Sequence, residues 1–75
     1  MQGEVVLKVF RGTVNVYERQ AGKGFIALDG EDVPVDLAGS RGVRLAVGMQ
    51  VEFQMIHRPE GVFAFAVKVI PQVLE

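Results

Sequence analysis

Apolar and polar residues alternate along much of this chain, which is the pattern of β-strands. Val14 and Val16 share one parity, and Val33, Val35 and Leu37 share one parity further along. Successive side chains of a strand point to opposite faces of a sheet, so this alternation places each apolar set on one face. Valine also suits a pleated surface better than a helix, and no stretch sustains apolar residues at helical spacing behind a capping residue. We therefore expect an all-β chain.

Turn signals divide the chain into five strands and one long loop. Gly22-Lys23-Gly24 and Asp29-Gly30 separate the first three strands, and Arg58-Pro59-Glu60-Gly61 joins the last two as a hairpin. The glycine-rich stretch from Ala38 to Gly48 is the long loop. The predicted strands lie near residues 5–17, 24–28, 32–37, 49–57 and 62–70.

Three strands, a long connection and a closing hairpin can curl into a small barrel, which removes the exposed edges of the sheet. A five-stranded antiparallel OB-type barrel has this number of strands, and an SH3-like barrel fits the alternation almost as well. The length of 75 residues suffices for one hydrophobic core. We expect residues 1–75 to form one domain, with residues 1–11 as an N-terminal strand extension.

Five short motifs decide between these barrels. Residues 12–17 have the sequence GTVNVY, residues 23–28 KGFIAL, residues 32–37 DVPVDL and residues 45–53 LAVGMQVEF, ahead of a closing strand at residues 61–67. In order and spacing they resemble the motifs of the cold-shock domain family. The resemblance implies an OB-type barrel that binds single-stranded RNA or DNA on its first three strands, without a cofactor.

Most of the rings on which that family stacks bases are replaced in this chain. Of the aromatic positions, Phe25 is kept and Tyr17 replaces a phenylalanine. The positions that lose a ring hold Val16, Ala27, Pro34, Asp36 and Leu37. Because each stacked base contributes about 1 to 3 kcal/mol, the resemblance implies weak binding.

The net charge of −1 provides no general attraction to a polyanion, so binding would depend on a local patch of aromatic and basic side chains. The predicted nucleic-acid-binding residues are Tyr17, Arg19, Lys23, Phe25, Arg41, Arg44 and Arg58. The alternative is a protein-interaction or self-associating module, in which replacements at the family's ring positions form an apolar contact surface. The apolar replacements in question are Val16, Ala27, Pro34 and Leu37.

The last strand carries two of the phenylalanines, and their parity predicts that they belong to the core. Phe63 and Phe65 share a parity with Val67 and Val69, so these four are expected to point inward. The intervening Ala64, Ala66 and Lys68 are then expected to point outward. Phe53 is predicted to be a core residue as well, because it shares its parity with Val51 and Met55.

Other chemistry has little support in the sequence. The single histidine, His57, and the single serine, Ser40, are expected to be solvated turn residues, and we expect no enzyme activity. Asp29, Glu31 and Asp32 could surround a cation at one hairpin turn, but such turns are more often acidic for solubility, and we expect no metal ion. Without cysteine or a long apolar run, a cytoplasmic protein with no membrane partner is expected.

Overall fold

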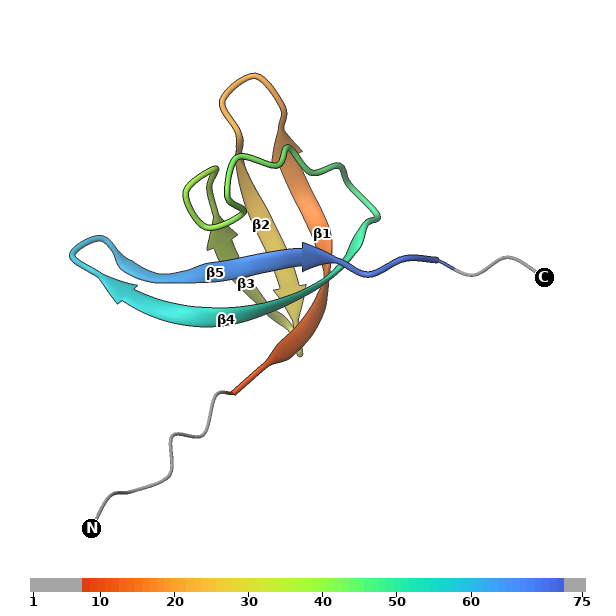
Figure 1. The fold of residues 1–75 in the computed structure, drawn as a ribbon. Helices are drawn as coiled ribbons and strands as arrows, with labels where there is room; N and C mark the ends of the chain where they lie inside the picture. The colour runs from red at the N-terminus through yellow and green to blue at the C-terminus, as the bar shows by residue number, and fades with distance from the viewer. Residues whose placement is uncertain (1–7, 73–75) are drawn as a thin grey trace, which may run out of the picture.

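The computed structural model describes residues 8–72, which form one antiparallel sheet of five strands (Figure 1). The prediction of an all-β chain with five antiparallel strands is confirmed. The strands are β1 (Phe10–Glu18), β2 (Lys23–Leu28), β3 (Glu31–Val35), β4 (Gln50–Arg58) and β5 (Gly61–Val69). Residues 1–7 of the predicted N-terminal extension lie outside the described residues, and Lys8 and Val9 precede the first strand.

The sheet has the strand order β3-β2-β1-β4-β5, so β1 lies at its centre. The turn between β2 and β3 has Asp29 at a φ of 51° and Gly30 at 83°, which is the left-handed backbone that a tight two-residue hairpin requires. The β4–β5 hairpin runs across the β1–β3 meander in Figure 1. Strands β3 and β5 also contact each other, although they are the two ends of the strand order. The sheet is therefore strongly curled, with the core inside the curl.

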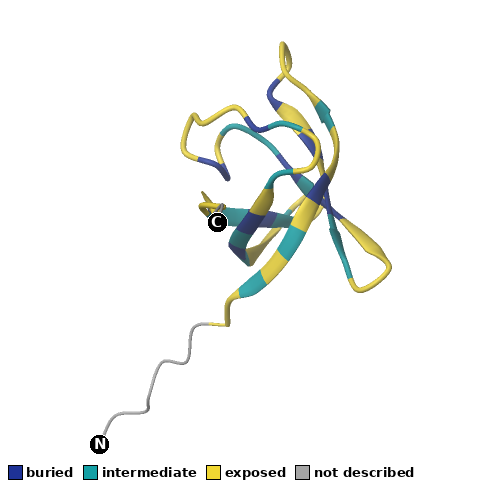
Figure 2. Ribbon diagram, turned by 90° about the vertical axis from the view of Figure 1, so that its right-hand side faces the viewer, coloured by how far each residue is buried: buried dark blue, intermediate teal, exposed yellow. Residues whose placement is uncertain are grey.

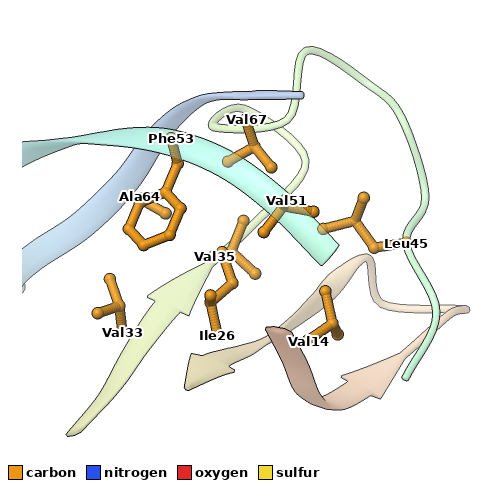
Figure 3. Packing of buried hydrophobic residues seen from close by; sticks show 9 residues of the cluster. All are labelled: Val14, Ile26, Val33, Val35, Leu45, Val51, Phe53, Ala64 and Val67. Atoms are coloured by element: carbon orange, nitrogen blue, oxygen red, sulfur yellow. The ribbon is translucent and has the colours of Figure 1, made fainter. Parts of the chain in front are cut away.

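The core collects apolar side chains from all five strands and from the long loop. They point toward one another between the meander and the hairpin in Figure 3. Each such side chain contributes about 1.5 to 3 kcal/mol when it leaves water. The core residues are Val14, Ile26, Val33, Val35, Leu45, Val51, Phe53, Ala64 and Val67.

A β-bulge in β1 changes which of its residues face this core. Val14 pairs with Ile26, and Val16 pairs with Phe25, which is the neighbour of Ile26 in β2. Asn15 is therefore an extra residue in β1. A bulge of this kind shifts the alternation by one position. Val14 is consequently buried while Val16 is 52% exposed. The prediction that these two valines share a face is wrong.

A second bulge, in β5, reverses the predicted parity of the residues that precede it in that strand. Glu52 pairs with Lys68 and Gln54 with Phe65, so β5 has one residue more than β4 between these pairs. Ala66, inside the bulge, has a φ of 54°. The extra residue brings both Ala64 and Val67 into the core.

The predicted inward set of β5 is therefore corrected. Phe63 and Phe65 are only half-buried and Val69 is exposed, whereas Ala64, predicted to face outward, is fully buried. The bulge is the physical reason for Phe63, Ala64 and Phe65, because a one-residue shift puts the two sides of the strand out of step. Val67 is buried and Lys68 is exposed, as predicted, and Val69 is the last residue of the strand. Phe53 is 1% exposed, as predicted. Figure 2 shows how buried and exposed segments follow one another along the strands.

Within the part of the chain that the structure describes, no helix has the length and apolar character needed to cross a membrane.

Candidate functional site

An open groove of about 480 Å³ lies on the side of the meander that faces away from the core. Its floor is a row of three residues that are neighbours across the sheet. Val16 of β1 pairs with Phe25 of β2, and Phe25 pairs with Pro34 of β3. Val16 is 52% and Phe25 41% exposed, so the floor offers apolar surface to solvent. Further lining comes from Glu18, Lys23, Gly24, Val35, Asp36, Arg58, Glu60 and Phe63.

The bulge at Asn15 explains why Val16, and not Tyr17, reaches this floor. Tyr17 packs against the core and lies over Gly24, where an added Cβ would be 2.7 Å from Cδ1 of the tyrosine ring. The Tyr17 hydroxyl is buried and has no hydrogen-bond partner among residues 8–72. Tyr17 and Phe25 therefore do not lie side by side on the exposed face, which corrects the expectation from the sequence.

The far wall of the groove is built by Arg58 at the end of β4 and Phe63 of β5. The guanidinium carbon of Arg58 lies 4.5 Å from the centroid of the Phe63 ring. Arg58 also donates two hydrogen bonds to Asp36, with Nη1 at 2.6 Å from Oδ2 and Nη2 at 3.3 Å from Oδ1. The guanidinium is thus held by a cation–π contact with the ring and by two hydrogen bonds to the carboxylate.

Asp36 also organises the start of the long loop. Its Oδ1 accepts a hydrogen bond from the Gly39 N–H at 3.0 Å, and its backbone carbonyl accepts one from the Ser40 N–H at 3.1 Å. Hydrogen bonding from Arg58 lowers the pKa of the Asp36 carboxyl below its ordinary value, and the Gly39 N–H adds to this against the opposing effect of burial. The same interaction raises the pKa of Arg58. Both side chains are therefore charged at neutral pH.

The charges of the groove do not sum to a basic patch. Three carboxylates, Glu18, Asp36 and Glu60, line it together with two cations, Lys23 and Arg58. Asp36 already neutralises Arg58, and Glu18 is the direct cross-strand neighbour of Lys23. A long phosphate backbone would therefore find few cations in this groove.

Of the seven predicted binding residues, the structure brings Lys23, Phe25 and Arg58 together in the groove. Arg19 lies in the turn after β1 and Arg44 in the long loop, and both are exposed outside the groove. Arg41 lines a separate hollow together with residues of β4 and β5.

The four apolar residues of the alternative hypothesis, a protein-contact surface, likewise lie partly in the groove and partly outside it. Val16 and Pro34 are on the groove floor. Ala27 lies elsewhere on β2, paired with Thr13 and Asp32. Leu37 covers Gly22, where an added Cβ would be 2.3 Å from the leucine Cγ.

Phe63, Glu18 and Glu60 are groove residues that the sequence interpretation missed, and Asp36 was not recognised as the partner of Arg58. Phe63 was assigned to the core because the bulge at Ala66 has no local signal, such as a glycine at the left-handed position. Asp36 and Arg58 are 22 residues apart, so only the fold brings them together.

The other polar candidates do not assemble a reactive centre. Ser40 is buried, with Oγ 2.7 Å from the Val43 carbonyl oxygen, so the expectation of a solvated serine is wrong. The reason is that the loop folds back on itself and uses the hydroxyl to satisfy its own backbone. His57 is exposed on β4. Among residues 8–72, no three His, Asp or Glu side chains gather in a way that could hold a metal ion.

Comparison with protein-family models gives no match to this chain, and comparison with curated proteins gives none either. The likeness to cold-shock domains is therefore a resemblance of short motifs, carried on a five-stranded all-β sheet.

Proposed function

We propose that this chain is a non-enzymatic, cold-shock-like module that binds single-stranded RNA or DNA weakly through its groove. The motif order supports the family, and the contact between β3 and β5 supports closure of the sheet into an OB-type barrel. The first three strands, which carry the nucleic-acid surface in that family, form the groove floor.

The observation that carries the proposal is the position of Phe25. Its ring is 41% exposed in the middle of the floor, beside Lys23 at the rim. A base stacks on an exposed ring whatever its identity, while a lysine near the ring meets the adjacent phosphate. One retained ring and one lysine that forms no salt bridge among the described residues support only low affinity, and we expect a dissociation constant of about 10 μM or weaker for a heptanucleotide.

An NMR titration of the ¹⁵N-labelled chain with mixed-sequence heptanucleotides at low salt tests this proposal. Amide shifts should concentrate at Val16, Lys23 and Phe25, and Phe25→Ala should abolish them. Val69→Ala is the matched control, because Val69 is equally exposed but lies outside the groove. Silence of the groove amides at millimolar oligonucleotide would refute nucleic-acid binding at this site.

A second candidate, a protein-interaction or self-associating module, is favoured by the charges of the groove. The apolar row of Val16, Phe25 and Pro34 is bordered by more carboxylates than cations, which suits an apolar protein surface better than a polyanion. Sedimentation velocity over a range of concentrations tests its self-associating form. Dimer formation that Val16→Asp abolishes, together with silence toward oligonucleotide, would establish this second function instead.

A further inference from the structure

The environment of Arg58 gives the groove a second flat surface. We propose that the Arg58 guanidinium, fixed between Asp36 and Phe63, is a base-stacking platform that acts together with Phe25 on a single strand. This inference rests on the proposed nucleic-acid function and assigns to Arg58 a role other than a phosphate contact.

Three observations define this platform. Asp36 accepts hydrogen bonds from both terminal nitrogens of the guanidinium, with Nη1 at 2.6 Å from Oδ2 and Nη2 at 3.3 Å from Oδ1. The guanidinium carbon lies over the Phe63 ring, 4.5 Å from its centroid. The Arg58 side chain is 23% exposed and lines the groove. The contacts with Asp36 and Phe63 hold the guanidinium in place, and its exposed part is open to a ligand in the groove.

The chemistry of the guanidinium then selects the ligand. It is planar and weakly hydrated, and it stacks on aromatic systems, whereas a phosphate requires free N–H donors directed at its oxygens. Asp36 engages one N–H of each terminal nitrogen, and its negative charge offsets the positive charge that would attract a phosphate. Unstacked bases are recognised by stacking on arginine planes as well as on aromatic rings. The site therefore takes the flat face of a nucleobase, and the nearby carboxylate disfavours a phosphate.

The two platforms come from different parts of the fold, so they can hold two bases of one strand. Phe25 belongs to the floor on β2, while Arg58 and Phe63 form the wall at the β4–β5 hairpin. Lys23 remains as the cation for the phosphate backbone. This arrangement compensates in part for the rings that the resemblance to cold-shock domains leads one to expect and that the chain lacks.

The side-chain ¹⁵Nε–¹Hε signal of Arg58 tests the inference directly. A heptanucleotide should shift this proton upfield through the ring current of the stacked base, and an abasic heptamer with the same phosphates should leave it unchanged. Arg58→Lys, which keeps the charge and removes the plane, should weaken heptanucleotide binding about 5-fold or more, the equivalent of one stacked base. The salt dependence of binding should stay as in the parent chain.

Two further variants separate stacking from a structural role. Arg11→Lys, at an exposed arginine that pairs with Glu52 outside the groove, should leave binding unchanged. Phe63→Leu keeps Arg58 and Asp36 but removes the supporting ring, and it should reduce the Arg58 Nε–H shift while the amide spectrum stays that of the folded chain.

Each result has a distinct meaning. If Phe25→Ala abolishes binding but Arg58→Lys binds normally and the Arg58 Nε–H signal does not move, the stacking role is overturned and the proposed function stands. If the abasic heptamer shifts the Arg58 signal as strongly as the base-containing one, Arg58 is a phosphate contact and the inference is wrong. If no groove signal responds to either oligonucleotide, both proposals fall.

Discussion

Asp36 accepts hydrogen bonds from both terminal nitrogens of the Arg58 guanidinium, although the two residues are 22 positions apart. Asp36 follows the last residue of β3 and Arg58 ends β4, so the pair ties the long loop to the β4–β5 hairpin. It also sets the shape of the groove wall. The contribution of the Asp36–Arg58 pair to the stability of the fold depends on the negative charge of Asp36.

Stability should fall in acid partly because this pair is lost. The pKa of Asp36 in the folded chain is lowered from its ordinary value of 3.8. A carboxyl whose pKa is lower in the folded state stabilises the fold above its unfolded pKa, and this contribution disappears as the pH falls through the folded pKa. The thermal midpoint of Asp36→Asn should therefore lie below that of the parent between pH 5 and 7. The two midpoints should converge below about pH 4. A gap that persists unchanged at pH 2 would contradict this account.

Tyr17→Phe should leave the stability unchanged or raise the free energy of unfolding by up to about 1 kcal/mol. The hydroxyl is buried and finds no hydrogen-bond partner in the described part of the chain, so its removal relieves a desolvation penalty while the ring keeps its packing over Gly24. Urea denaturation of both proteins measures the difference. A loss above about 1 kcal/mol would mean that the hydroxyl has a partner, such as an ordered water.

Phe53→Ala should destabilise the fold by about 3 to 5 kcal/mol, because it empties the largest fully buried side chain of the core. The alternation in β5 alone predicts that Phe65 is a core residue and that Phe65→Ala causes the same loss of stability. Since Phe65 is only half-buried, Phe65→Ala should cost clearly less. Parallel denaturation curves decide the order, and a larger loss for Phe65→Ala would show that the bulge at Ala66 is misplaced.

Ala66→Gly should stabilise the fold by up to about 1 kcal/mol. Ala66 has a φ of 54°, a left-handed conformation that strains an L-residue and that glycine adopts freely. The gain is reduced by the larger entropy of glycine in the unfolded chain. Ala64→Gly is the matched control, because this fully buried alanine lies outside the positive-φ set and should lose stability. If both variants lost stability equally, β5 would have no bulge at this position.

Lys23→Ala should reduce the salt dependence of oligonucleotide binding. Lys23 is a groove cation that forms no salt bridge among the described residues. Each lysine that meets a phosphate of a single strand contributes about −0.7 to the slope of log K against log salt. The variant should lose about this amount, measured by titration at three salt concentrations. Lys68→Ala, exposed on β5 away from the groove, should keep the parent slope, and equal losses in the two variants would show that phosphate contacts are diffuse.

The sequence by itself determined the five strands, because their signals are local. Alternation over a few residues specifies a strand, and a pair such as Asp29-Gly30 specifies the turn that ends it. The shared parity of Val51 and Phe53 placed Phe53 correctly in the core. The selection of Phe25, which is exposed, came from the resemblance to cold-shock domains and not from the alternation.

Only the tertiary structure decided which residues share the groove. The bulges at Asn15 and Ala66 each shift the alternation by one position, which brings Val16 and Phe63 to the groove and turns Tyr17 toward the core. Neither bulge has a local signal, because Asn15 and Ala66 stand where a glycine would have marked the irregularity. The pairing of Asp36 with Arg58 likewise depends on the approach of two strand ends that are distant along the chain. A pattern of period two cannot register an extra residue or a contact between distant segments, and these determined the shape and charge of the candidate site.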